Sequence, residues 1–325
     1  MFRIDRRLLQ NVDWVLLATA LALIGLGLLT LWSLPTRSAS GGASWRQLSW
    51  VGVGLLALLA VASLDYRRLI RFAPAFYLGG VALLVTVFVV GRPVAGARRW
   101  LSLGPISLQP SELFKLIFIL TLVWALTSRW RDQLPRGVTL FSLGLLAIPV
   151  FLMARQPDLG SALVLLPVLL AILIGASVEF RLMGWLGAGA LAAAPLTWFV
   201  LKGYQRERLL VFLDPFRDPL GSAYNVIQAR IAIGSGQLLG KGIRGATQSQ
   251  LAFLPERHTD FIFAVFAEQW GFVGCLVLIV GYAVLFLRGF DIAATTREPA
   301  GRLLALGVTA LQAALMDSIP IVAFT

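Results

Sequence analysis

Three acidic residues stand at the starts of apolar runs, where a carboxylate could carry acid–base or ion-binding chemistry. They are Glu112 in "QPSELFK", Asp158 in "RQPDLGSA" and Asp260 in "RHTDFIF". A carboxylate beside a hydroxyl can act as a general base, and carboxylate and phosphate oxygens together suit Mg²⁺. Each acid also has a structural interpretation, because Asp is a favoured N-cap and an acid in the first helical turn complements the helix dipole. Three such acids, each in a polar cluster, favour a shared site.

Basic residues add to this pattern. Lys115 follows Glu112 by three residues, so the two share one face of a helix. An ordinary salt bridge would explain that spacing, but a lysine one turn inside an apolar run needs a further reason. Arg98 and Arg99 precede Trp100, and they could anchor the chain at a membrane interface or hold an anionic headgroup.

The third acid follows the only histidine in the chain, His258, and Thr259. Their position directly before Asp260 predicts a supporting role in the same site, although histidine often serves only as a hydrogen-bonding residue. Glu268 lies about 12 Å deeper in the same helix, at a rise of 1.5 Å per residue. We expect it to pair with another helix.

The composition indicates which elements position these residues. Hydrophobic residues make up 58% of the 325 residues and charged residues only 14%, compared with about 25% charged residues in a soluble domain. The chain is therefore expected to be a polytopic membrane protein with no cleaved signal peptide. Its single cysteine, Cys275, excludes a disulfide within the chain. The net charge of +12 comes from scattered arginine clusters, which favour contact with membrane lipids over nucleic acid.

About nine apolar stretches are long enough, or nearly so, to cross a bilayer as helices. The pattern lacks the alternation of a membrane β-barrel, so we expect an all-α bundle. The stretches are 14–34, 48–64, 72–90, 111–127, 138–154, 159–177, 183–201, 261–287 and 303 onward.

Arginines between the stretches predict the orientation. With the N-terminus inside, the inner segments hold 13 arginines and the short outer segments hold 6. This assignment places 35–47, 91–110, 155–158 and the long loop 203–260, between spans 7 and 8, on the outer face. All three acids then lie at the outer ends of helices.

The long outer segment combines Asp-Pro pairs, an amphipathic stretch near 222–233 and the glycine-rich run "GSGQLLGKG". This run fails as a phosphate-binding loop, because Ser235 replaces a required glycine and Gly242 replaces the residue that would hold magnesium. We expect a mobile cover over the site or a contact for a partner. The sequence contains no cluster of Cys and His for a metal, so metal ligands would come from Asp260, Glu112 and Asp158.

Four strings carry a family resemblance: "WLSLGPISLQPSELFK", "RQPDLGSALVL", "FLDPFRDPLGSAYNVIQARIAIGSGQLLGKG" and "TQSQLAFLPERHTDFIFAVFAE". They resemble the SEDS family (shape, elongation, division and sporulation), in particular its elongation branch. The resemblance implies a transmembrane glycosyltransferase domain over 1–310, in a family of about ten spans. Residues 311–325 depart from the family pattern, as expected of a truncated or spliced end, and the family's last outer loop and tenth span have no counterpart.

The resemblance implies a peptidoglycan glycosyltransferase in the inner membrane of a bacterium. It would polymerise lipid II on the outer face, release undecaprenyl diphosphate, and work with a class B penicillin-binding protein and other elongation-complex proteins. Asp260 matches the family's essential aspartate. The departing diphosphate needs countercharge from Lys, Arg or a divalent cation such as Mg²⁺ or Mn²⁺. A flippase for the lipid-linked precursor and a membrane scaffold remain as alternatives.

Overall fold

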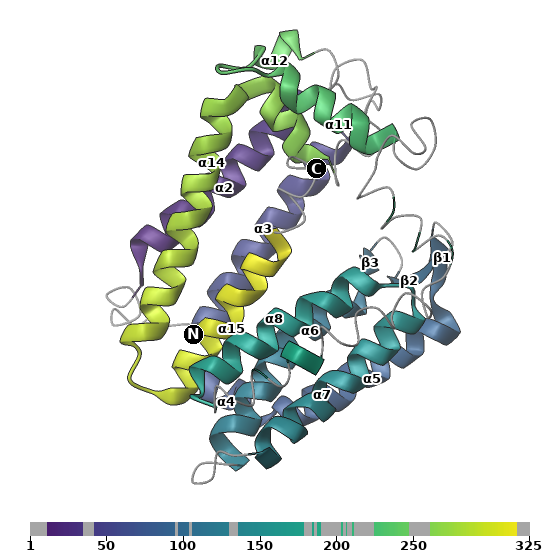
Figure 1. Ribbon diagram of the computed structural model, residues 1–325, viewed down its shortest axis with the longest axis vertical. Coiled ribbons are helices and arrows are strands. Elements are labelled where there is room, and N and C mark those ends of the chain that lie inside the picture. Colours follow the sequence, from purple (N-terminus) through teal and green to yellow (C-terminus); the bar gives the residue numbers. More distant parts are fainter. Residues whose placement is uncertain are drawn as a thin grey trace. The chain divides into compact units, whose positions relative to one another are not determined.

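A computed structural model describes residues 12–34, 42–94, 97–103, 106–129, 136–178, 224–246 and 261–316, with a few isolated positions between 184 and 210 (Figure 1). The described chain is almost entirely helical. Seven of its helices are long and apolar enough to cross a membrane, and a shorter apolar helix accompanies them. The expected all-α polytopic membrane fold is confirmed. Most of the expected span 183–201 lies outside the described residues.

The chain divides into two compact units, which we describe separately. Unit 1 contains α2 (Trp14–Ser33), α3 (Gly42–Ala62), α11 (Tyr224–Ser235), α12 (Gly242–Gly245) and α14 (Ile262–Thr295) as far as Arg288. Asp13 caps α2, since its Oδ1 accepts the N–H of Leu16 at 2.9 Å, and its Oδ2 lies 2.7 Å from Nη2 of Arg288. A small apolar cluster joins α2, α11 and the start of α14 through Leu31, Leu34, Ala229, Ala232, Ala264 and Val265.

Unit 2 begins with α4 (Tyr66–Arg71) and α5 (Ala73–Val90). A three-stranded antiparallel sheet follows, with β1 (Arg92–Val94), β2 (Ala97–Leu103) and β3 (Ile106–Leu108) in that order. The remaining elements are α6 (Pro110–Trp124), a π-helical turn η1 (Ala125–Arg129), α7 (Arg136–Arg155), α8 (Leu159–Gly175) and α15 (Pro299–Met316). Phe114, Phe118, Leu165 and Ile172 lie fully buried in its core.

The glycine-rich run is bound to α14, which differs from the expected mobile cover. Gly271 has φ 64° and ψ −163°, so it kinks α14 and separates the N–H groups beyond it from their usual helical acceptors. Carbonyl oxygens of Gln237 and Leu238 accept the N–H groups of Phe272 and Val273 at 2.8 and 3.1 Å. The run therefore satisfies backbone groups that would otherwise be unpaired at membrane depth.

Glycine is needed at this contact because the two backbones lie very close together. A Cβ on Gly236 would lie 2.1 Å from the carbonyl oxygen of Ala267, and one on Gly240 would lie 2.2 Å from that of Gln269. Gly240 also has φ +80°, which favours glycine. Gly236 and Gly240 of "GSGQLLGKG" thus allow close backbone packing against α14. We call the contact between 236–241 and the Gly271 kink the glycine clasp.

Candidate active site

Asp158 is the centre of a buried polar cluster at one end of unit 2. Asp158 is only 5% exposed as a whole residue. Its Oδ2 accepts hydrogen bonds from Oγ of Ser111 at 2.9 Å and Nε2 of Gln109 at 3.1 Å. Its Oδ1 lies 3.7 Å from Nη1 of Arg99, and Nη2 of Arg99 donates to the carbonyl oxygen of Pro157. The cluster therefore joins β2, the start of α6 and the start of α8.

The capping interpretation does not hold for the side chain of Asp158. Asp158 occupies the N-cap position of α8, but its carboxylate makes no capping hydrogen bond. The carboxylate instead faces donors from two other elements. A buried carboxylate in such surroundings needs hydrogen-bond donors, and a functional role for Asp158 stays a prediction.

Lys115 and Glu112 lie on the first turns of α6, as their spacing predicts. Nζ of Lys115 is 2.8 Å from Oε1 of Glu112, with the lysine side chain 3% exposed and the glutamate side chain 53% exposed. The pair thus places a buried ammonium beneath a carboxylate that faces out of the protein. Ser111, the residue before Glu112, donates a hydrogen bond to the Asp158 carboxylate, so both acids lie at the start of α6.

One side-chain donor of Arg99 has no partner in the described part of the protein. Its Nε is buried and has no hydrogen-bond partner among the residues that the structure describes. A buried N–H without an acceptor is costly, and a bound anion is one way to satisfy it. Together with Lys115, Arg99 makes this end of unit 2 a place where an anionic group would be stabilised.

Beneath this polar cluster the interior of unit 2 is apolar. Gln156 donates from Nε2 to the carbonyl oxygen of Leu84 at 2.7 Å, and the layers below contain Phe114, Phe118 and Leu165. Within the described part of unit 2, every charged side chain of a spanning helix lies near one of the two helix ends. The polar chemistry is therefore gathered at the ends and does not form a track through the unit.

The opposite end of unit 2 carries a different cluster. Arg67 lies at the beginning of α4 and reaches Glu298 with Nη2–Oε2 at 2.7 Å and Nε–Oε1 at 3.0 Å, while the Tyr66 hydroxyl donates to the same carboxylate at 2.6 Å. Hydrogen bonds from Arg67 and Tyr66 lower the pKa of Glu298, and burial and the Glu298 contact raise the pKa of Tyr66. The Arg67 side chain is 65% exposed, so this cluster is a surface ion pair.

The side chains of the other predicted site residues lie outside the described part of the structure. Asp260, His258 and Thr259 lie outside the described residues, and Arg98 is described only through its backbone pairing with Pro93 in the β1–β2 ladder. Convergence of Asp260 with Glu112, Lys115 and Asp158 therefore stays a prediction.

Two residues of the cluster were not singled out from the sequence. Gln109 and Ser111 stand in the string "QPSELFK", where the proline at the first helical position and the acid drew attention first. The available signal was their place beside Pro110 at a helix start. Glu268 is fully buried, and its carbonyl oxygen accepts the N–H of Lys241 in the glycine clasp at 3.0 Å.

A metal site was also expected from the three acids. No group of three or more His, Cys, Asp and Glu side chains suited to a metal occurs within the described ranges. The Asp158 oxygens are occupied by donors and by Arg99, so Asp158 does not fit a metal ligand in this arrangement.

Comparison with known proteins places this arrangement in a family. Residues 13–319 match the FtsW, RodA and SpoVE family, described as "Cell cycle protein". The peptidoglycan glycosyltransferase MrdB of Escherichia coli K12 is 40% identical over 304 residues, covering 92% of this chain and 80% of that protein. A probable peptidoglycan glycosyltransferase FtsW of Alkalilimnicola ehrlichii is 36% identical over 315 residues, covering 92% and 77%.

Solved structures agree with the sequence relatives. A chain from a study of polymerization and crosslinking by a peptidoglycan synthase complex superposes with a TM-score of 0.78 at 33% identity, covering 96% of this chain and 87% of that one. RodA of Thermus thermophilus superposes with a TM-score of 0.68 at 29% identity, covering 93% and 82%. The match spans both units and every described helix that could cross a membrane. The chain therefore belongs to the FtsW, RodA and SpoVE family of polytopic membrane proteins, which is the SEDS family.

Proposed function

We propose that this chain is a peptidoglycan glycosyltransferase that polymerises lipid II into glycan strands during cell elongation. Relatives at 40% and 36% identity are named peptidoglycan glycosyltransferases, and the chain covers most of their length. The structural observation that carries the proposal is the cluster of Arg99 with the buried Asp158 and Lys115 at one end of a unit with an apolar interior. Such a cluster suits a substrate with a lipid tail in the bilayer and a charged diphosphate at its surface.

The reaction assigns a role to each kind of residue. The 4-hydroxyl oxygen of the acceptor sugar forms a bond to the anomeric carbon of the donor, and its proton passes to the carboxylate of Asp260 as general base. The bond from the anomeric carbon to the diphosphate oxygen breaks, and undecaprenyl diphosphate leaves with the electron pair. Lys115 and the free Nε of Arg99 stabilise the charge that develops on the leaving group. Asp158 holds Arg99, and Arg98, His258 and Thr259 are further candidates for substrate contact.

A divalent cation remains a separate part of the proposal. Asp260 and the half-exposed Glu112 are its candidate ligands, because the oxygens of Asp158 are already occupied. Mg²⁺ or Mn²⁺ would supply countercharge to the diphosphate when bound. Polymerisation measured in a chelator series, followed by return of each metal, tests this part alone.

The proposal also covers the orientation of the protein in the membrane and its partners. The Arg99–Lys115 cluster is proposed to lie at the outer face of the bacterial cytoplasmic membrane, with the opposite Arg67 end in the cytoplasm, in agreement with the arginine distribution. A class B penicillin-binding protein is the proposed partner, supported by the similarity to a chain from a peptidoglycan synthase complex. Other elongation-complex proteins and membrane lipids are further proposed partners.

A flippase is the main alternative, and the position of the charges disfavours it. A path for a polar headgroup should place charged or polar side chains through the depth of the bilayer. In the described part of unit 2, the layers between the two charged ends hold large apolar side chains such as Phe118, Leu122 and Ile172.

Two assays on the purified protein separate these functions. Labelled lipid II in detergent, with and without the class B partner, should yield glycan polymers on a gel. The same protein in liposomes should not move lipid II between leaflets faster than empty liposomes do. Transbilayer movement without polymer formation would contradict the proposal.

A further inference from the structure

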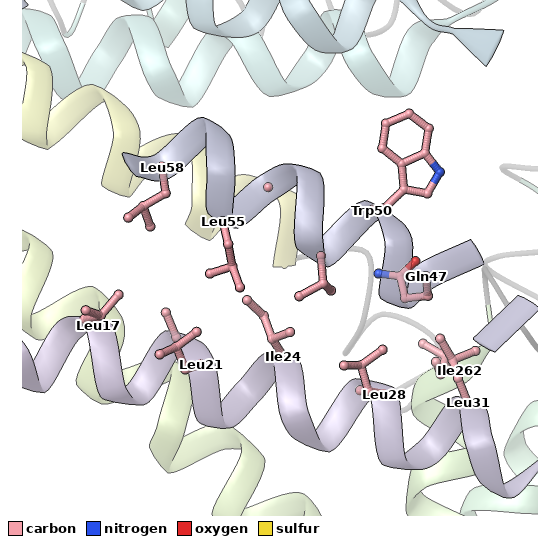
Figure 2. A pocket seen from close by; sticks show the side chains of 14 residues that line it. Leu17, Leu21, Ile24, Leu28, Leu31, Gln47, Trp50, Leu55, Leu58 and Ile262 are labelled. Carbon is pink, nitrogen blue, oxygen red and sulfur yellow. The ribbon is translucent and has the colours of Figure 1, made fainter. Parts of the chain in front are cut away.

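An apolar groove runs between α2 and α3 in unit 1, with a volume of about 580 Å³ (Figure 2). Residues spaced three or four apart line it along one face of α2, among them Leu17, Leu21, Ile24, Leu28 and Leu31. In Figure 2 the side chains of Leu21, Ile24 and Leu55 point toward one another across the gap. All but one of the lining residues is apolar, and the exception, Gln47, lies near the end of the groove at Leu31.

The length of the groove limits what can fill it. From Leu17 to Leu31 the lining stripe extends about 21 Å along α2, at 1.5 Å per residue. The hydrocarbon core is about 30 Å thick, so one leaflet accounts for about 15 Å of it. An ordinary phospholipid chain ends near the midplane, and a chain that fills this groove must continue beyond it. A long isoprenoid chain has the required length.

One end of the groove lies beside the start of α14 in unit 1. Leu31 and Ile262 line that end, and Ile262 follows Asp260 by two residues in the sequence. Leu31 and Ile262 also pack in the apolar cluster that contains Ala229 of α11. The next residue of α11 is Arg230, whose Nε and Nη2 are buried without a hydrogen-bond partner among the described residues. An anion bound beside Arg230 would satisfy those donors, since guanidinium groups suit phosphate oxygens.

We infer that this groove binds the isoprenoid chain of a polyprenyl diphosphate, with Arg230 as a ligand of the diphosphate. The inference deepens the proposed function and rests on it, because lipid II and its released carrier are lipids of this kind. The apolar stripe selects the tail, and the unpaired guanidinium donors select the charged head at the end nearest Asp260 in sequence. A phospholipid tail or a helix of a partner protein is the competing occupant.

The test uses undecaprenyl diphosphate with a photoreactive group in its isoprenoid chain, bound to the purified full chain in nanodiscs. Labelled peptides from α2 and α3 are identified by mass spectrometry. We expect labelling at the groove stripe and competition by unlabelled undecaprenyl diphosphate. Equal competition by phosphatidylglycerol would show a general lipid surface and overturn the inference.

The two helices offer matched variants. A Cβ on Gly54, which lines the groove, and one on Gly52, which does not, would both meet nothing within 4 Å. Gly54→Leu should fill the groove and reduce groove labelling about tenfold or more, and Gly52→Leu should leave it unchanged. Both variants change the same helix by the same residue, so a common loss would indicate a folding effect, which thermal unfolding measures directly. Gly27→Leu and Gly25→Leu form the second pair, on α2, and keep the test valid if α3 does not tolerate leucine.

The head group is tested through Arg230. Arg230→Gln should weaken binding of undecaprenyl diphosphate roughly tenfold and leave undecaprenol, which lacks the diphosphate, unaffected. Equal weakening of both lipids would remove Arg230 from the site.

Polymerisation of lipid II is measured in parallel, so that failure of the groove assignment can be told apart from failure of the proposed function. If the parent protein polymerises lipid II but Gly54→Leu and Gly52→Leu are labelled equally, the groove is not the lipid-binding site. The proposed glycosyltransferase activity then stands. A parent protein that never polymerises, yet takes up the probe in the groove, contradicts the proposed function and leaves a polyprenyl diphosphate site. Specific loss in Gly54→Leu, with a raised KM for lipid II, supports both.

Discussion

The two ends of unit 2 carry the same kinds of side chain in different surroundings. At one end Asp158 is 7% exposed at its side chain, and Arg99 opposite it is 29% exposed. At the other end the paired side chains of Glu298 and Arg67 are 35% and 65% exposed. Water screens the second pair more than the first, and loss of Arg99 would leave the buried Asp158 carboxylate without its counter-charge. An Arg–carboxylate pair therefore says little about function until its burial is known.

Asp158→Asn should have the largest effect among variants of described residues. Asn caps a helix about as well as Asp, so a capping residue would tolerate the change. The amide removes the charge opposite Arg99, and we expect polymerisation to fall about 10²-fold or more with the fold retained. Glu298→Gln makes the same chemical change at the exposed end and serves as the control. Equal polymerisation rates for the two variants would abolish the distinction between the ends.

Lys115→Met tests whether the buried ammonium acts on substrate. A group that stabilises the leaving diphosphate should cost about 10²-fold in kcat/KM when removed. Glu112→Gln, which changes the half-exposed partner, should cost clearly less. If the two residues formed only an ion pair, each variant and the double variant would lose the same amount, and steady-state kinetics of all three would show it.

Gly240→Ala tests whether the close backbone contact of the glycine clasp stabilises unit 1. The added Cβ would approach the carbonyl oxygen of Gln269, and the positive φ adds strain, so we expect destabilisation of about 1–3 kcal/mol. Gly242→Ala is the matched control, with φ +69° but nothing within 4 Å of its Cβ. Thermal unfolding should separate the two variants. Identical melting temperatures would mean that 236–241 is not held against α14 in solution.

The smallest effect is expected at the exposed pair and depends on pH. Because the pKa of Glu298 is lowered in the folded protein, its contribution is present above the unfolded value near 4.5 and is lost as pH falls through the folded value. Glu298→Gln should therefore change the melting temperature little at neutral pH and remove the loss below pH 4.5. A large destabilisation at pH 7 would show that this pair is more than a surface contact.

Hydrophobic length predicted the spans well but not their ends. The stretch 72–90 corresponds to α5 at Ala73–Val90, whereas α3 begins at Gly42 instead of 48 and α14 continues to Thr295 instead of 287. Both extensions are polar, as in "GASWRQ" and "RGFDIAAT", and hydropathy does not detect helix outside the bilayer. The sheet β1–β3 also escaped prediction, because its strands are short and follow no long apolar alternation.

The site was predictable in part. A carboxylate or lysine at a helix start within an apolar sequence is unusual, so Glu112, Lys115 and Asp158 stood out. Gln109 and Ser111 are ordinary polar residues, and they become hydrogen-bond donors to Asp158 only because α6 and α8 pack together. The glycine clasp likewise depends on a kink at Gly271 that no periodicity reveals.

Glycan polymerisation by the Asp260→Asn variant tests the central claim most directly, with melting temperature and monodispersity measured alongside. An amide cannot accept the proton of the acceptor hydroxyl, so the account predicts a loss of about 10²–10⁴-fold in a protein that unfolds like the parent. A helix cap would tolerate the same change. Near-parental glycan synthesis by a well-folded Asn variant would contradict the account and place the chemistry elsewhere.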